Sequence, residues 1–254
     1  MIVKDFAKII ERIAPIESAM DFDNVGLLVG SLEKEVTKVL ICVDVTSDVI
    51  EEAIECDCNL IISHHPIIFN PIKRFLNDDY INDIIAKAFV NDINIYAAHT
   101  NVDRMEGNMS WLTLKSLGCN SIGKLQDDGI GAIGDLENPI TLGELKDILE
   151  PLLSDTLVKV VGDKNMEISC VAMVNGAGAD SVTLRTALDR GGEVLITSDV
   201  KHHIMLEALA IDLPIIEVGH YASEKIFIDI VYDSIKCYFD TTKIIKHYEG
   251  NPYN

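Results

Sequence analysis

Short apolar runs alternate with amphipathic stretches along most of the chain. Runs of about four to eight branched residues, bounded by turn residues, are typical of buried strands. Such runs predict strands at 39–45, from Asn59 up to the adjacent histidines at 64 and 65, and at 93–98, 157–161, 167–174, 194–197 and 214–218. The turn residues and glycines at 21–30 also predict a turn that leads into a short strand.

Between the runs, apolar residues recur at the period of a helix. In the first stretch they share one helical face, and Pro15 ends that helix. Thr141 and Glu144 form a capping box that opens another helix. The other predicted helices cover 47–55 with Ser47 as N-cap, 79–90, a stretch closing at Gly118, one ending near Arg190, and one carrying His202 and His203 after a Ser198-Asp199 cap.

Alternation of strands and helices indicates α/β architecture, with mixed or parallel sheets covered by helices. Around Ser121 to Asn138 the character of the chain changes. Glycines at 123, 129, 131 and 134 and an acidic pair at 127–128 indicate a domain boundary there. A second α/β pattern follows, so the 254 residues divide into two domains.

Charge narrows the range of partners. The net charge is −20, with 41 acidic against 21 basic residues, so a nucleic-acid or anionic-membrane partner is not expected. Charged residues interrupt the first fifteen positions, which excludes a signal peptide and favours a cytosolic location. The six cysteines are expected to be reduced core residues, because Cys56 and Cys58 have no second cysteine pair nearby to complete a metal site.

The histidines are the strongest chemical signal. Six of the seven lie in four places, and three of these places directly follow a predicted strand. In open α/β sheets, ligands bind beyond the carboxyl ends of the strands. The residues concerned are His64-His65, His99, His202-His203 and His220, with Asp103 four positions after His99 and Glu224 four positions after His220.

Spacing and residue type together indicate metal ligands. Residues four apart in a helical turn share a face, so His220 and Glu224 can converge on one ion. His64 and His65 lie where the chain turns, so they can serve two ions. Imidazole with carboxylate suits zinc, iron, manganese, nickel or cobalt without specifying which, and paired ions that share a carboxylate activate water.

Three other features have alternative interpretations. His202 and His203 are either an exposed helix pair or residues near the site. The glycine turn, Asn175 to Gly178, is either a tight strand–helix connection or a phosphate cradle, and the former is favoured. His247, in a charged tail, is expected on the surface.

Taken together, the motifs at 63–69, 98–103 and 219–224, with the Asp21-to-Leu27 segment, resemble the Nif-three-like (YbgI) family. Members of that family are often called GTP cyclohydrolase 1 type 2 homologues. The resemblance covers nearly the whole chain, and Ser198 and the glycine turn depart from the family pattern. It implies that a second α/β domain, 123–213, is inserted into a metal-binding α/β domain formed by 1–122 and 214–254.

The resemblance also implies a dinuclear metal centre in a toroidal homohexamer. Matched motif by motif, the ligands would be His64, His65, Asp103, His220 and Glu224, with Glu224 as the bridge. Asp199 to His203 would approach the internal cavity.

Two classes of function follow. The first is a metal-dependent hydrolase of a small, nucleotide-like substrate, with His99 as candidate proton shuttle. The second is a non-enzymatic, metal-binding oligomeric adaptor or regulator. A dinuclear phosphoesterase would use the same ligands as the hydrolase.

Overall fold

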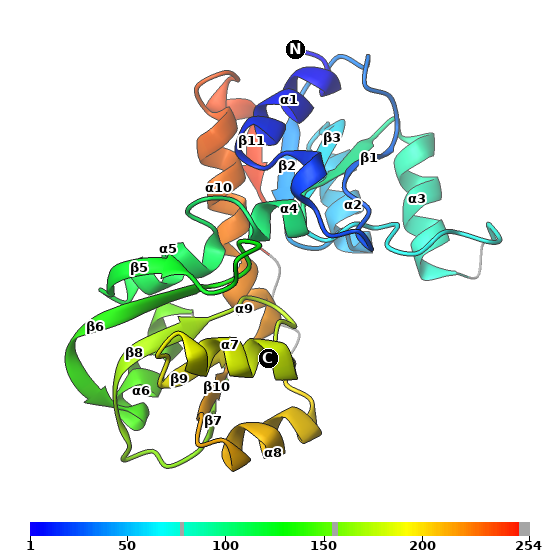
Figure 1. Ribbon diagram of the computed structural model, residues 1–254. Helices are drawn as coiled ribbons and strands as arrows, with labels where there is room; N and C mark the ends of the chain where they lie inside the picture. Colours follow the sequence, from blue (N-terminus) through cyan, green and yellow to red (C-terminus); the bar gives the residue numbers. More distant parts are fainter. Residues whose placement is uncertain (77–78, 154–156, 249–254) are drawn as a thin grey trace. The chain divides into compact units, whose positions relative to one another are not determined.

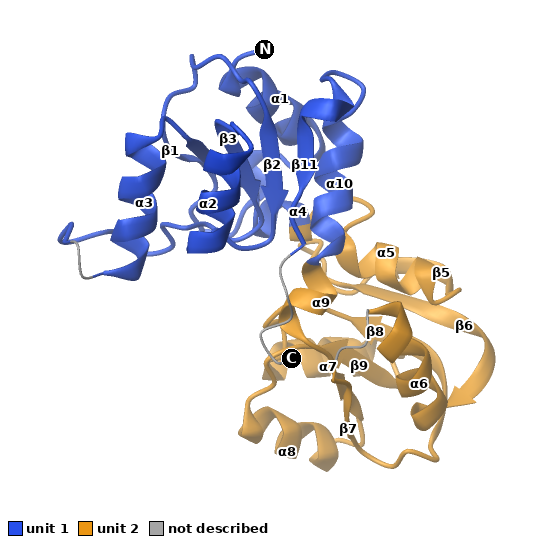
Figure 2. Cartoon of the chain, turned by 180° about the vertical axis from the view of Figure 1, so that it is seen from behind, with its two compact units in different colours: residues 1–102, 225–249 blue, residues 103–224, 250–254 orange. Residues whose placement is uncertain are grey.

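The computed structural model describes residues 1–76, 79–153 and 157–248. The chain divides into two compact units (Figures 1 and 2). Unit 1 comprises 1–102 and 225–249, and unit 2 comprises 103–224 and 250–254. The chain therefore leaves unit 1 after Val102 and returns to it at Lys225.

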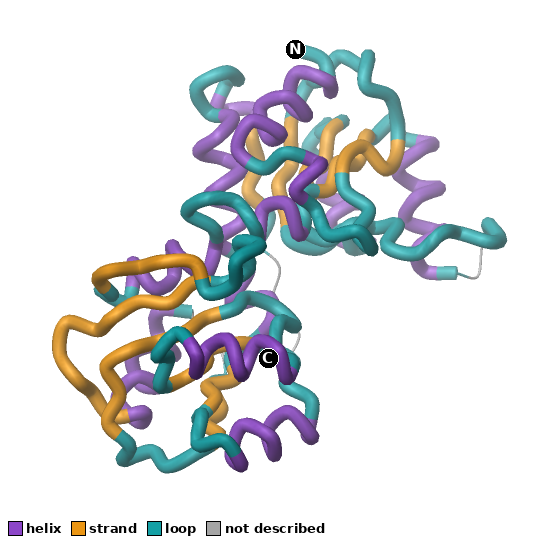
Figure 3. Tube along the Cα trace, in the orientation of Figure 1, coloured by secondary structure: helices purple, strands orange, loops and turns teal. Residues whose placement is uncertain are grey.

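Unit 1 is built on one sheet with the strand order β1-β4-β3-β2-β11. β2, β3, β4 and β11 run parallel, and β1 pairs antiparallel with β4. Figure 3 distinguishes the strands from the helices and loops around them. The strands are β1 (Gly26–Val29), β2 (Val39–Cys42), β3 (Leu60–Ser63), β4 (Asn94–Ala97) and β11 (Ile244–Lys246).

Helices cover both faces of this sheet. Side chains of β2 alternate between the faces, so Leu40 and Cys42 join a core with α2 and α3. On the other face, α10 packs on β2 and β11, and α1 packs on α10. The elements are α1 (Val3–Ile13), η1 (Ile16–Ser18), α2 (Ser47–Glu55), α3 (Tyr80–Val90), α10 (Ile226–Ile235) and η2 (Thr241–Lys243). The short α4 (Thr100–Asp103) spans the crossing into unit 2.

Unit 2 has a mixed sheet with the order β5-β6-β8-β9-β10-β7. β8, β9 and β10 run parallel, whereas β5, β6 and β7 pair antiparallel with their neighbours. The strands are β5 (Asn120–Lys124), β6 (Ala132–Thr141), β7 (Lys159–Val161), β8 (Glu167–Met173), β9 (Val194–Thr197) and β10 (Ile215–Glu217).

The unit 2 core lies between its sheet and two helices. Leucines of α5 and α6 pack on buried side chains of β8 and β9. α7 packs on β9, and α8 packs on α7. The helices are α5 (Met109–Ser116), α6 (Leu142–Leu152), α7 (Ser181–Asp189), α8 (His202–Ala210) and α9 (His220–Glu224).

The predicted α/β class with helix-covered sheets is confirmed. The units of the structure divide at 102/103 and 224/225, whereas the sequence placed the boundaries at 122/123 and 213/214. The difference arises because α5 packs on β5 and β6, and because β10 pairs with β7 and β9 of unit 2. The glycine-rich boundary stretch itself contains most of β5 and most of β6.

Two helix caps differ from prediction. The N-cap of α2 is Thr46, whose hydroxyl accepts a hydrogen bond from Val49 N–H at 3.3 Å, so Ser47 lies one position inside the helix. The N-cap of α8 is Lys201, which makes no side-chain cap. The carboxylate of Asp199, predicted to cap α8, instead contacts His220.

Within the described residues, no helix is both long enough and apolar enough to cross a membrane.

The capping box of α6 gives a direct test of local stability. Thr141 Oγ1 accepts from Glu144 N–H at 3.2 Å, and the Glu144 carboxylate accepts from Thr141 N–H at 2.7 Å. We expect Thr141→Ala to lower the free energy of unfolding by about 1 kcal/mol, because an orphan amide of the helix loses its acceptor. Thr141→Ser keeps the hydroxyl and should stay near wild type in urea denaturation followed by circular dichroism. Equal losses in both variants would contradict the capping role.

Candidate metal centre

His64 and His65 directly follow β3, and backbone hydrogen bonds fix their positions. His64 N–H donates to Cys42 O at 3.3 Å, and His65 N–H donates to Val43 O at 2.9 Å. The His64 side chain is fully buried, and its ring lies 5.0 Å, centroid to centroid, from Phe227 of α10. The β3–β2 pairing therefore continues past Ser63 far enough to set both imidazoles at the end of the sheet.

His99 comes to the same place from the neighbouring strand. Ser63 of β3 is paired in register with Ala97 of β4, so the chain after β4 runs beside the chain after β3. The rings of His64 and His65 lie 5.1 and 5.4 Å from the ring of His99. One nitrogen from each ring lies within 4.8 Å of the others, a spacing that could hold a metal ion. These three residues form the imidazole cluster.

Each imidazole of the cluster is oriented through its Nδ1 atom. His64 Nδ1 lies 3.0 Å from Ala98 O, His65 Nδ1 lies 2.8 Å from Asp44 Oδ1, and His99 Nδ1 lies 2.9 Å from Asp23 Oδ1. An acceptor at Nδ1 favours the tautomer that carries its proton there. Nε2 is then the atom available as a ligand, the arrangement seen when metal-ligating histidines are held from behind by carbonyls and carboxylates.

Asp23 is held in its charged form. Its side chain has no solvent exposure, and burial alone would raise the pKa of the carboxyl. Hydrogen bonds from His99 and from the hydroxyl and amide of Thr100 outweigh burial and lower the pKa far below its ordinary value. A charged carboxylate behind His99 fixes the orientation of that ring and favours the tautomer with its proton on Nδ1.

Unit 2 supplies a separate histidine–carboxylate pair in α9. His220 Nε2 lies 3.0 Å from Glu224 Oε2, the separation that an i,i+4 step on a helical turn produces. His220 Nδ1 lies 2.6 Å from Asp199 Oδ2, so this imidazole is also held from behind by a carboxylate. Glu224 is only 4% exposed, which places a carboxylate in a region of low dielectric.

The glycine turn packs directly on this pair. Gly176 has φ +60°, and a Cβ atom there would collide with Glu224 Oε1 and lie 3.2 Å from His220 Nε2. Ser223 Oγ accepts from Gly176 N–H at 3.1 Å, which holds the turn against α9. The turn connects β8 to α7, and its glycine allows the backbone to approach the two side chains.

Asp103 occupies the last position of α4. Its side chain is half-buried, and its carbonyl accepts from Asn108 Nδ2 at 2.9 Å. Asp103 thus follows immediately after the point where the chain leaves unit 1, and Glu224 lies immediately before the point where it returns.

Other predicted candidates lie elsewhere. His202 and His203 are exposed at the start of α8. His247 pairs with Glu52, and its side chain is 18% exposed, so it lies half-buried beside exposed neighbours. Burial, reinforced by the charge of Cys56, raises the pKa of Cys58 to about 12, which disfavours the thiolate that a metal would need. Among the described residues, groups with metal-ligand spacing contain no cysteine.

The sequence did not identify the orienting carboxylates. Asp23, Asp44 and Asp199 each contact an Nδ1 atom. Asp199 follows a predicted strand and Asp44 lies near the end of another, which is the signal that would have found them. Asp23 lies in a turn far from His99 in sequence, and only its place in the Asp21-to-Leu27 motif marks it.

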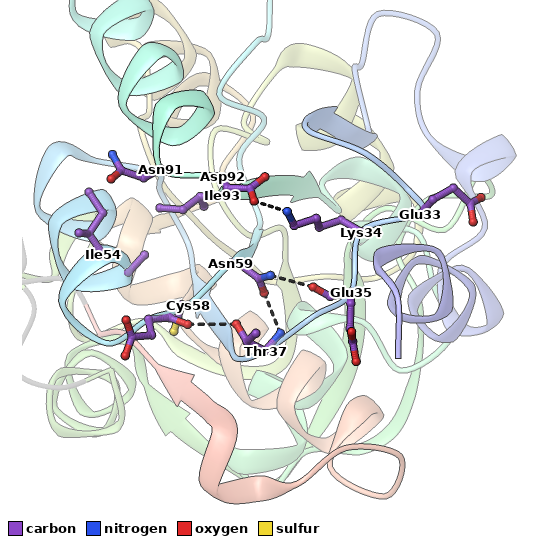
Figure 4. Close-up of a pocket in the computed structure, with 12 residues that line it drawn as sticks. Glu33, Lys34, Glu35, Thr37, Ile54, Cys58, Asn59, Asn91, Asp92 and Ile93 are labelled. Carbon is purple, nitrogen blue, oxygen red and sulfur yellow. Dashed lines mark hydrogen bonds and ion pairs between the residues drawn. The ribbon is translucent and has the colours of Figure 1, made fainter.

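A polar hollow of about 740 Å³ lies at the opposite end of the unit 1 sheet (Figure 4). The Asn59 side chain binds the backbone that lines this hollow: its Oδ1 accepts from Thr37 N–H at 2.9 Å, and its Nδ2 donates to Glu35 O at 2.8 Å. Lys34 pairs with Asp92 across the same hollow. These groups bond one another, and they precede the strands whose far ends carry the imidazole cluster.

Known proteins are similar to this chain over most of its length. A "GTP cyclohydrolase 1 type 2 homolog" of Clostridium acetobutylicum is 36% identical over 229 residues, which cover 87% of this chain and 85% of the relative. A protein of the same name from Lactococcus lactis is 31% identical over 261 residues, covering 100% of this chain and 99% of the relative.

Two solved structures have the same fold as this chain over nearly its whole length. A hypothetical protein of Staphylococcus aureus superposes with a TM-score of 0.91 at 26% identity, covering 100% of this chain and 99% of that one. Reduced HcgD from Methanocaldococcus jannaschii gives 0.84 at 25% identity and 97% coverage of both chains. A sequence model described as Duf34/NIF3 (NGG1p interacting factor 3) matches residues 1–251, and the chain belongs to that family.

Proposed function

We propose that this protein is a dinuclear metal-dependent hydrolase of a small, nucleotide-like substrate. The proposed ligands are His64, His65, Asp103, His220 and Glu224. The observation that carries the proposal is the imidazole cluster, with three rings at ligand spacing and each Nδ1 atom already bound to an acceptor.

Chain connectivity supports a role for the α9 pair and Asp103 in the same centre. Asp103 is four residues beyond His99. Phe227, three residues beyond Glu224, packs on the His64 ring within unit 1. Both carboxylates are therefore tethered by a few residues to positions beside the imidazole cluster.

The residues present suit divalent ions. When bound, such ions lower the pKa of a water molecule and supply hydroxide near neutral pH. Glu224, a buried carboxylate with two oxygens, is the proposed bridge. His99 is the proposed proton carrier: Asp23 holds its Nδ1 proton, and proton transfer would occur at Nε2.

The substrate class follows from relatives. The Clostridium and Lactococcus proteins are named as homologues of a GTP cyclohydrolase, which favours a purine nucleotide. Chemistry of the ligand set alone does not choose between ring opening and phosphoester hydrolysis.

Removing a proposed ligand tests the centre. We expect His64→Ala and Glu224→Gln to lose most bound metal in elemental analysis after purification, because each removes an atom from the first coordination sphere. His202→Ala, which changes an exposed histidine of α8, is the matched control and should retain metal. Folded ligand variants, judged by circular dichroism, that kept the full metal content would contradict the assignment.

Gly176→Ala tests the close approach of the glycine turn. The added methyl group must displace Glu224 and His220, so metal affinity should fall by about 10–100-fold, the range for residues that orient ligands. Gly107→Ala is matched in backbone strain, with φ +68°, but meets nothing within 4 Å. Competitive titration with a chelating dye compares the two variants, and equal affinities would show that the turn does not position the pair.

Turnover separates an enzyme from an adaptor. Metal-loaded protein should hydrolyse at least one member of a panel of purine nucleotides and phosphoesters, and Glu224→Gln should abolish that activity. Metal binding that requires the proposed ligands, without turnover of any member of the panel, would contradict the hydrolase proposal. The non-enzymatic adaptor hypothesis would then replace it.

A further inference from the structure

Two exposed phenylalanines stand beside the imidazole cluster in unit 1. Phe22 is 61% exposed and Phe69 is 45% exposed. Their ring centroids are 6.1 Å apart with an interplanar angle of 59°. Phe69 in turn lies 6.2 Å from the His99 ring at an angle of 79°. The three rings form a continuous row that begins in the cluster and ends in solvent.

The row is held in place by the groups that build the site. Phe22 precedes Asp23, the carboxylate that holds His99 Nδ1. Asn24 Nδ2 donates to Ile68 O at 2.6 Å, which ties the Phe22 loop to the Phe69 loop. Ile67 is buried in the unit 1 core, so the loop carrying Phe69 is anchored two residues before the exposed ring.

We propose that Phe22 and Phe69 are specificity-determining residues that form an aromatic platform for the planar nitrogen heterocycle of the substrate. This inference rests on the proposed nucleotide-like substrate and names the side chains that recognise its base. Aromatic rings bind a base through its π-face, in stacked or edge-to-face geometry.

Charge explains why such a contact matters here. The net charge of −20 repels an anionic nucleotide at long range. Stacking on an uncharged ring is not weakened by that field. Stacking of the base would thus supply binding affinity that the phosphate cannot. The rings of Phe22 and Phe69 would hold the base next to His99.

The test compares guanosine 5′-monophosphate with ribose 5-phosphate, which has the same sugar and phosphate but no base. Calorimetric titration of protein with measured metal content should give a Kd at least about tenfold lower for the nucleotide. Phe69→Ala and Phe22→Ala should bring the two Kd values together and leave ribose 5-phosphate binding and metal content unchanged. Phe69→Trp should preserve the preference, which a purely structural role for Phe69 would not predict.

Phe89→Ala is the matched control, because Phe89 is 74% exposed on α3 and makes no ring contact with the cluster among those described. Equal Kd values for the two probes in wild type, or no nucleotide binding at millimolar concentration, would overturn the platform. So would a Phe69→Ala protein that dissociates from an oligomer in light scattering while keeping the base preference, since the rings would then be an interface between copies. Failure of the proposed metal centre would appear separately: folded ligand variants would keep their full metal content, whatever the Kd values of the two probes.

Discussion

Parallel pairing of β2, β3 and β4 is the constraint on which the candidate centre depends. In-register parallel strands end together, so residues that follow them meet at one edge of the sheet whatever their distance in sequence. That is why His64, His65 and His99 converge although an intervening helix separates β3 from β4. The same edge receives Asp44 from β2, whereas at the opposite edge Asn59 bonds to Thr37 and Glu35, and Lys34 pairs with Asp92.

Much of this arrangement could be predicted from the sequence, because its signals are local. The strand at 194–197 and the capping box at Thr141 correspond to β9 and the start of α6 as predicted. Apolar runs and caps act over a few residues, so periodicity and residue type suffice to identify them. A histidine after a strand end is likewise recognised from a few residues, although the site that such histidines form joins residues far apart in sequence.

What the sequence could not supply depends on tertiary contacts. β5 and β6 were missed because glycines that suit turns also occur in strands that must pass close to a neighbour; a Cβ at Gly134 would lie 3.0 Å from an atom of Ile122. Nor does a loop carboxylate reveal which imidazole it faces, so Asp23 and Asp199 were not identified as orienting groups. Thr46 and Ser47 are both good caps, and only the backbone conformation of the helix entry selects Thr46.

The discontinuity of unit 1 has a consequence for biosynthesis. β11 pairs with β2, and Phe227 packs on His64, so two parts of the unit 1 core belong to a segment that a ribosome makes after the strands of unit 2. Unit 2 has its strands in one continuous stretch and can fold while that segment is still being translated. Until α10 and β11 are made, one face of the unit 1 sheet lacks α10 and the backbone groups of β2 that pair with β11 are unpaired. An unpaired strand edge of this kind can pair with strands of other chains. The histidines are thus synthesised early and receive their final packing late.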